Sequence, residues 1–202
     1  KGSKCSISNA GAADFMVVYA KTDPAAGARG VSAFIVEPKK IDDVSVAPNE
    51  KTMGLKGGHV FGISFDCWVP DENRLGDEGT GFRTAMKVLD NGRIEVAAQA
   101  TGIADAALKA AISYAKERQV SGHAIADFQG LQWILADSAT ELAAARALAM
   151  QAATLRGTGV RYSSESAFPK LYASGAAWRC TDRGMQVHGS DRYARDVPVG
   201  SD

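Results

Sequence analysis

The chain has 202 residues, and its apolar content of 46% is enough to build the core of one large or two modest domains. Its 23 lysines and arginines balance its 23 aspartates and glutamates, so no net charge attracts nucleic acid or an anionic membrane, and an anionic ligand must be held by local donors. No apolar run is long enough to span a bilayer, and no stretch has the pattern of a secretory signal.

The N-terminal part of the chain, residues 1–76, predicts β-structure. Short runs of β-branched and aromatic residues occur at 15–20, 30–38, 43–48 and 60–70, and prolines and glycines separate them. This punctuation is typical of hairpins, so we expect a sheet or a partial barrel. The opening "KGSK" reads like the middle of a strand, which predicts that an upstream portion is missing.

From residue 77 onward alanine dominates and strand signals vanish. The run "GTGFRTAMKVL" predicts a short helix, and Asp90 or Asn91 is placed to cap a second helix that reaches about Arg118. The residues expected to face inward on this second helix are Ile94, Ala98, Gly102, Leu108, Ile112 and Ala115.

The segment "SGHA" predicts a break before the next helix. From Asp127, small and apolar residues follow one helical face until Gly157 and Gly159 end it. Ser163 or Ser164 is then placed to cap a last helix. The inward positions are expected to be Leu131, Leu135, Leu142, Ala145, Ala149 and Ala152 before that break, and Leu171, Ala173, Ala176, Ala177 and Thr181 after it.

The last helix runs toward Gln186, but Pro169 interrupts it, and an interior proline costs on the order of 3 kcal/mol unless a kink is accommodated. Short connections imply antiparallel neighbouring helices. Strands followed by helices, rather than alternating with them, indicate the α+β class. We therefore expect a partial β-barrel or sheet domain over residues 1–76, followed by an antiparallel α-helical bundle over residues 77–202.

Cysteine and histidine usage gives no sign of a disulfide framework or a metal site. Cys5, Cys67 and Cys180 are an odd number without C-x-x-C spacing, which favours a reducing compartment. We expect all three to be small buried or half-buried side chains. The three histidines have no metal-ligand spacing, so no metal is predicted.

Several motifs together resemble the acyl-CoA dehydrogenase family. They are "KCSISNAGAADFMVVYAKTD", "EKTMGLKG", "FDCWVPDENRLGDEGTGF", "LDNGRIEVAAQATGIADAAL", "YAKERQVSGHAIADFQGLQWILAD" and "QVHGSDRYARDVPV", in this order. The resemblance implies a central β domain and a C-terminal four-helix bundle, with FAD between them and an N-terminal helical domain before them. It also implies that this chain begins inside the β domain and stops before the last helix of the bundle.

The resemblance makes Asp90 and Arg93 candidate contacts of the CoA portion of a thioester, because they belong to the family's L-D-x-G-R motif. A guanidinium suits this role, since its fixed fork of N–H groups matches carbonyl and phosphate oxygens. The alternative is that Asp90 caps a helix while Arg93 pairs with it on the surface.

Further residues are implied as FAD contacts. Arg118 and Gln129 resemble the pair that reaches the flavin of a neighbouring subunit, which implies a homodimer or homotetramer. Taken without the resemblance, Arg118 is a cation in the last turn of a helix and Gln129 a solvated amide. Gln186 and Gly189 match the Q-x-x-G-G turn, where missing side chains let backbone N–H groups approach phosphate oxygens, and Ser190, at the second glycine position, is a further candidate contact.

The "CSISN" segment matches the family's W-I-T-N strand beside the flavin ring, which makes Ser6 and Ser8 candidate contacts of the isoalloxazine. Two departures bear on activity. Ser6 replaces the usual aromatic residue and so removes stacking area. Ser190 and Arg192 change the glycine-rich turn, where their side chains can obstruct a phosphate, although Arg192 adds a compensating charge.

The chemistry implied by the resemblance is α,β-desaturation of an acyl-CoA, with an electron-transferring flavoprotein as acceptor. The family's base is the glutamate of an I-Y-E-G-T motif, and this chain ends at "VPVGSD"; one branch instead has a glutamate where Gly92 stands here. Glu95 lies about 200° further round the helix from Arg93. We therefore name no catalytic residue.

The favoured hypothesis is a fragment of a FAD-dependent acyl-CoA dehydrogenase for short or branched acyl chains, located in a bacterial cytoplasm or, in a eukaryote, in the mitochondrial matrix. Its rival from another class is a non-catalytic relative that serves as a CoA-binding or oligomerisation module. An acyl-CoA oxidase is a lesser alternative, and peroxide production in air would mark it.

Overall fold

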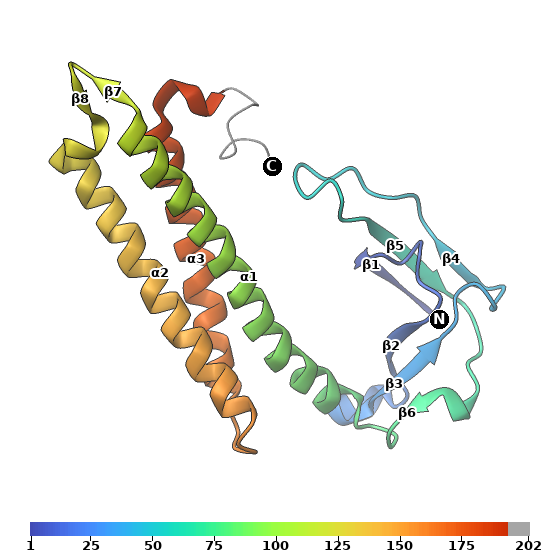
Figure 1. Cartoon of the computed structure of the whole chain (residues 1–202). Coiled ribbons are helices and arrows are strands. Elements are labelled where there is room, and N and C mark those ends of the chain that lie inside the picture. The colour runs from blue at the N-terminus through green and yellow to red at the C-terminus, as the bar shows by residue number, and fades with distance from the viewer. Residues whose placement is uncertain (194–202) are drawn as a thin grey trace. The chain divides into compact units, whose positions relative to one another are not determined.

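The computed structural model describes residues 1–193 of the chain. The chain forms two compact units, of which unit 1 is Lys1–Lys87 and unit 2 begins at Val88. The division falls within helix α1, Gly81–Glu117, so that no loop separates the units (Figure 1). No helix among residues 1–193 has the length and apolar character needed to cross a membrane.

Unit 1 contains two antiparallel three-stranded sheets. The first has the order β1 (Gly2–Ser8), β5 (Val60–Phe65), β4 (Val44–Val46), and the second has the order β2 (Met16–Lys21), β3 (Val31–Val36), β6 (Arg74–Leu75). All four runs predicted as strands contain one, which confirms the α+β class. The two-residue strand β6 was not predicted, because a strand this short has no alternating pattern.

A bulge interrupts the β1–β5 pairing at a position that matters for function. Lys4 pairs with Ile63 and Ile7 with Phe61, so two residues of β1 lie opposite one of β5. Ser6 lies in this bulge with a φ of 56°, in the left-handed region that disfavours residues other than glycine. A bulge turns a side chain away from the alternation of the strand, so the direction of Ser6 is set by this local backbone.

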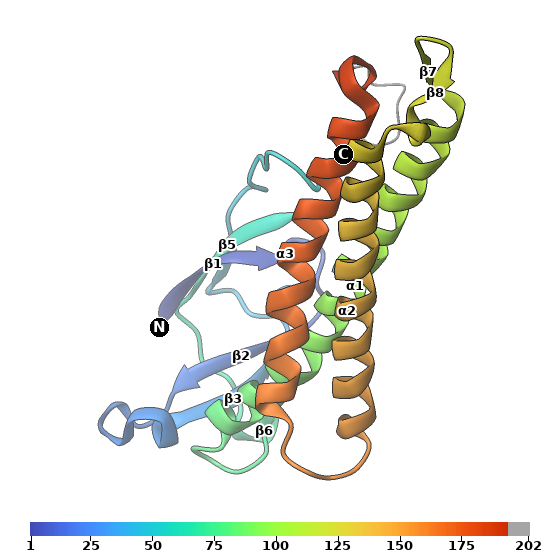
Figure 2. The same cartoon turned by 90° about the vertical axis from the view of Figure 1, so that its left-hand side faces the viewer.

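Unit 2 contains three long helices that lie side by side (Figures 1 and 2). They are α1, α2 (Gln129–Arg156) and α3 (Ser163–His188), and a short 3₁₀ helix, Gly189–Tyr193, follows α3. Their shared core is built mostly from alanine, with Leu142 and Cys180 as larger members. Small side chains let the backbones approach closely, which a bundle without large core residues requires.

The predicted break at "SGHA" is a β-hairpin. Strand β7, Gln119–Val120, pairs with β8, His123–Ala124. Ser121 and Gly122 form the turn with φ values of 53° and 82°. Two successive residues with positive φ give the turn whose twist matches a two-residue hairpin, and a 3₁₀ helix, Ile125–Asp127, then leads to α2.

The predicted helix boundary at Asp90 or Asn91 is wrong, because α1 runs through both residues without a break. Neither side chain caps a helix: Asp90 pairs with Arg93, 2.7 Å from oxygen to nitrogen, and Asn91 accepts a hydrogen bond of 2.6 Å from the Tyr162 hydroxyl. Polar side chains that seemed free to cap are therefore used to join α1 to the start of α3.

The predicted cap of α3 is also wrong. The residue before the helix is Tyr162, whose side chain makes no capping bond, and Ser163 is the first helical residue. The Ser163 hydroxyl donates instead to Oδ2 of Asp90 over 2.7 Å. Pro169 does not interrupt α3, which continues to His188 with the proline ring fully buried.

Three residues predicted to face inward are exposed, namely Ala98, Gly102 and Leu171. On α1 the buried row is instead Ala97, Ala104 and Ala111. Neighbouring alanines have the same hydropathy, so a pattern of alanines cannot fix which face packs inward. The expectation for the cysteines holds for Cys67 and Cys180, whereas Cys5 is exposed.

Candidate functional site

Residues far apart in the sequence meet at one end of unit 2. Arg118 directly follows α1, Gln129 is the first residue of α2, and Gln186 lies in the last turn of α3. Ala115, Ile125 and Val187 pack in one buried cluster there, which shows that these three helix ends adjoin (Figure 1). We call this the hairpin end: Arg118, the β7–β8 hairpin, Gln129 and the Gly189–Tyr193 turn.

The Gly189–Tyr193 turn begins at a residue that only glycine fits well. Gly189 has a φ of 56° and a ψ of −128°, a conformation that side chains with a Cβ rarely adopt. Within residues 1–193 no atom lies within 4 Å of the place where a Cβ would be, so the described part of the chain leaves the surface over this glycine open. Gln186, Gly189, Ser190, Arg192 and Tyr193 line an open depression of about 500 Å³ beside it.

The chemistry of the donors at the hairpin end fits an anionic ligand. Arg118, Gln129, Gln186 and Ser190 are all exposed. Nη1 of Arg192 donates to Oε1 of Gln186 over 3.3 Å, which leaves the Gln186 NH₂ group free to donate outward. Two guanidinium groups, two amides and a hydroxyl are suited to the oxygens of a dinucleotide diphosphate.

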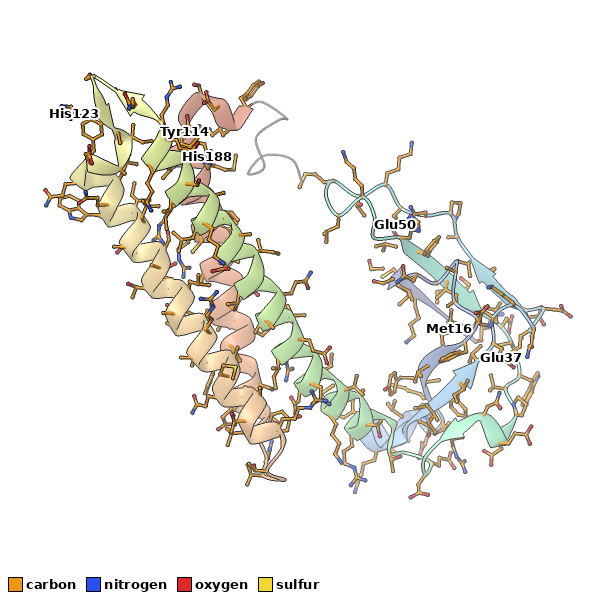
Figure 3. The ribbon with its side chains drawn as sticks, in the orientation of Figure 1. Met16, Glu37, Glu50, Tyr114, His123 and His188 are labelled. Carbon is orange, nitrogen blue, oxygen red and sulfur yellow. The ribbon has the colours of Figure 1, made fainter. Side chains whose placement is uncertain are left out.

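Sequence reasoning missed three further polar side chains, of which Asp191 belongs to this turn and Tyr114 and His188 lie in the helices next to it. The Tyr114 hydroxyl donates to Oδ2 of Asp191 over 2.7 Å, and the rings of Tyr114 and His188 are stacked with centroids 4.5 Å apart (Figure 3). The hydrogen bond to Asp191 raises the pKa of the Tyr114 phenol above its usual 10.0, burial raises it further, and Arg118 opposes the rise. Tyr114 and Asp191 are 77 residues apart, so no local pattern pairs them.

Asp90 and Arg93 lie away from the hairpin end, near the start of α3. Arg93 is separated from Arg118 by roughly 40 Å of helix at 1.5 Å per residue. The Asp90 carboxylate is 14% exposed and also accepts from Ser163, whereas the Arg93 side chain is 37% exposed. The ion pair of the alternative interpretation is therefore present, although the helix cap is not. Contact with CoA remains a prediction for both residues.

Ser6 and Ser8 belong to strand β1 of unit 1, and both are exposed. Ser8 pairs with Val60 and lines an open depression of about 600 Å³ that also includes Asn9 and His59. Their contact with an isoalloxazine ring remains a prediction.

Comparison with known proteins gives a consistent result over the whole chain. The family model of the acyl-CoA dehydrogenase middle domain matches residues 1–67, and that of the acyl-CoA dehydrogenase C-terminal domain matches residues 79–201. Acryloyl-CoA reductase (NADH) of Anaerotignum propionicum is 45% identical over 98% of this chain and 50% of its own length. The caffeyl-CoA reductase–Etf complex subunit CarC of Acetobacterium woodii is 44% identical over 98% of this chain and 52% of its own.

Among solved structures, butyryl-CoA dehydrogenase from Megasphaera elsdenii is similar with a TM-score of 0.93 and 41% identity, covering 98% of this chain and 52% of that protein. The chain thus spans about half the length of the curated relatives it matches. The two family models match consecutive parts of the chain, a β part followed by a helical part, as in the structure. The two relatives are each more than 40% identical to the chain. The chain therefore belongs to the acyl-CoA dehydrogenase family.

Proposed function

We propose that this chain is part of a FAD-dependent acyl-CoA dehydrogenase, which desaturates the α,β bond of a short or branched acyl-CoA thioester. The observation that carries the proposal is the meeting of Arg118, Gln129 and Gln186 at the hairpin end, next to the open backbone of Gly189. The similarity to butyryl-CoA dehydrogenase, at 41% identity, supports a short acyl chain.

Each unit by itself contains proposed FAD contacts. In unit 2, Arg118, Gln129 and Gln186 offer donors to its diphosphate and adenosine, Gly189 leaves backbone room for phosphate oxygens, and the Ser190 hydroxyl is a proposed further contact. In unit 1, Ser6 and Ser8 are proposed contacts of the flavin ring. FAD, when bound, supplies an acceptor for the hydride that leaves the β-carbon of the thioester.

Asp90 and Arg93 are proposed to bind the CoA portion of the substrate. Asp90 takes one N–H of the guanidinium and so fixes its plane, while the remaining N–H groups of Arg93 stay available to carbonyl or phosphate oxygens. No residue of the chain is assigned as the base that removes the α-proton. Glu95 is exposed and points about 200° away from Arg93 around the helix.

Two kinds of partner follow from this proposal. An electron-transferring flavoprotein would reoxidise the enzyme, and the Etf complex named for the A. woodii relative supports this partner. A second copy of the chain would complete the flavin site, giving a homodimer or homotetramer. We place the protein in a reducing compartment such as the bacterial cytoplasm, or the mitochondrial matrix if the source is eukaryotic.

An absorption spectrum tests the proposal directly. We expect the purified chain to bind added FAD, with the flavin bands shifted relative to free FAD, because the hairpin end offers donors to the cofactor. Oxidised flavin that bleaches on addition of butyryl-CoA or isobutyryl-CoA would support dehydrogenase activity. A protein that takes up no FAD contradicts the proposal, and peroxide formed in air identifies an oxidase.

A non-catalytic relative is the second candidate function, favoured by the side chains of Ser190 and Arg192 in a turn that the family keeps glycine-rich. Such a protein would keep the scaffold as a CoA-binding or oligomerisation module. Isothermal titration with CoA and with FAD distinguishes the two candidates, since this module binds CoA but not FAD.

A further inference from the structure

We propose that Tyr114 is a positioning residue of the FAD site: it holds the Asp191 carboxylate against α1, so that this negative charge does not oppose the cofactor's diphosphate at the Gly189–Tyr193 turn. The inference rests on the proposed function, because it concerns the same site. It assigns a role to a contact that joins residues 77 positions apart.

The Asp191 carboxylate poses an electrostatic problem for an anion site. It belongs to the same short turn as Gly189 and Ser190, and two negative groups within a few ångströms repel each other strongly at a partly buried position. The Tyr114 hydroxyl donates to Oδ2 of Asp191 over 2.7 Å, a distance typical of a strong charge-assisted hydrogen bond. This bond stabilises the charge and directs the carboxylate toward the helix.

The Tyr114 ring is itself held in place by the His188 ring. It stacks on His188, with ring centroids 4.5 Å apart and planes inclined by 30°. The His188 ring is buried, and its Nδ1 lies 2.7 Å from the Gly184 carbonyl oxygen. Since a carbonyl oxygen only accepts, Nδ1 carries the proton, and the imidazole has one orientation. The hydroxyl of Tyr114 is therefore held in one place for Asp191 (Figure 3).

A second tether acts on the other side of the turn. Arg192 donates to the Gln186 side chain over 3.3 Å. Asp191, and Arg192 at a glycine position of the family's turn, are thus each bound to a helix, to α1 and α3 respectively. The open surface over Gly189 is kept free of both.

A double-mutant cycle tests the inference, with Tyr114→Phe, Asp191→Asn and the double variant in the full chain. FAD binding is measured by the quenching of flavin fluorescence. Tyr114→Phe keeps the ring stacked on His188 but releases the carboxylate, so we expect about a tenfold weaker affinity for FAD. Asp191→Asn removes the charge and should not weaken binding, and adding it to Tyr114→Phe should restore the affinity to within about twofold of wild type.

Restored FAD affinity in the double variant distinguishes a positioning role of Tyr114 from a structural one, because a packing defect caused by Tyr114→Phe would persist in the double variant. A double variant as weak as Tyr114→Phe, or an unchanged affinity of Tyr114→Phe, overturns the inference. If the wild-type chain itself binds no FAD, the proposed function fails and the inference fails with it. Tyr172→Phe serves as the matched control, since within residues 1–193 the Tyr172 hydroxyl makes no hydrogen bond, and it should bind FAD like wild type.

A flavin-independent measurement accompanies the cycle. Ultraviolet titration of the tyrosines reports the phenol that titrates above the usual range because of Asp191. Asp191→Asn should move one tyrosine toward its ordinary pKa, and Tyr114→Phe should remove that tyrosine from the titration. Identical curves for wild type and Asp191→Asn would show that the contact is absent and would also overturn the inference.

Discussion

Several polar side chains of this chain join two helices, a role that their positions in the sequence do not reveal. Asp90 is the clearest case, because it looks like a helix cap but lies inside α1, where its carboxylate binds Arg93 and the Ser163 hydroxyl. Ser166, one turn further along α3, lies 3.4 Å from the same carboxylate, but its hydroxyl donates over the shorter 2.9 Å to the Ser163 carbonyl oxygen. A largely buried acid that binds two donors contributes to stability as well as to any ligand site.

Replacing Asp90 by asparagine should therefore destabilise the chain. Asparagine removes the charge that Arg93 and the Ser163 hydroxyl share, and the loss of charged hydrogen bonds costs about 1 to 2 kcal/mol. The free energy of unfolding in urea, with an unchanged denaturant slope, measures this cost. Asp137→Asn is the control, since Asp137 is exposed on α2 and makes no hydrogen bond with any residue in 1–193. Equal stability of the two variants would contradict the prediction.

Tyr114 also gives stability a pH dependence. The pKa of its phenol is raised in the folded chain, chiefly by the hydrogen bond to Asp191. A raised pKa contributes stability that is fully present below the unfolded value of about 10 and is lost as the pH rises through the folded value. As the pH rises above about 10, wild type should lose stability more steeply than Tyr114→Phe, which thermal unfolding at a series of pH values measures. Parallel losses in the two proteins would contradict this.

At the scale of elements, the end of α3 depends on one glycine. Gly189→Ala should cost about 1 to 2 kcal/mol, because alanine is strained at a φ of 56° even though its Cβ has room. Thermal unfolding measures the cost, and FAD titration shows whether the turn has moved. Gly157→Ala is the matched control, since Gly157 ends α2 with an ordinary φ of −81° and should tolerate alanine. A Gly189→Ala variant as stable as Gly157→Ala would contradict the prediction.

The sequence predicts these elements unevenly, for physical reasons. The strands around residues 15–20 and 30–38 were found because β-branched runs end at turn residues, and both appear as β2 and β3. The break predicted at Asp90 is absent because capping residues and helix-joining residues look alike in a sequence. Ala98 was wrongly predicted to face inward on α1, because neighbouring alanines have the same hydropathy and the pattern does not distinguish the two faces.

The candidate site shows the same limit. The motif positions Arg118, Gln129 and Gln186 were named from their resemblance to the family, and the structure brings them to one end of unit 2. The contact between Tyr114 and Asp191 was not predicted, because it depends on how α3 lies against α1 and not on local spacing.

At the scale of the whole molecule, unit 2 exposes several large apolar side chains. Trp133, Leu171 and Trp178 are each more than 60% exposed, and we propose that they contribute to an interface with a second copy. The proposed flavin site also requires a neighbouring copy. Light scattering should therefore give a mass that is a multiple of 21.2 kDa, two or four copies. A monomer that still binds FAD would contradict the shared site.

The β7–β8 hairpin connects two of the proposed cofactor contacts by the shortest route. Arg118 enters it and its carbonyl accepts from the Ile125 backbone, while Gln129 begins the helix a few residues later. One extra residue in the turn would change which strand positions pair, and both ligand-binding side chains would shift together. Most surface loops tolerate an extra residue, but we expect an insertion in this hairpin to weaken the proposed FAD binding while the chain still folds.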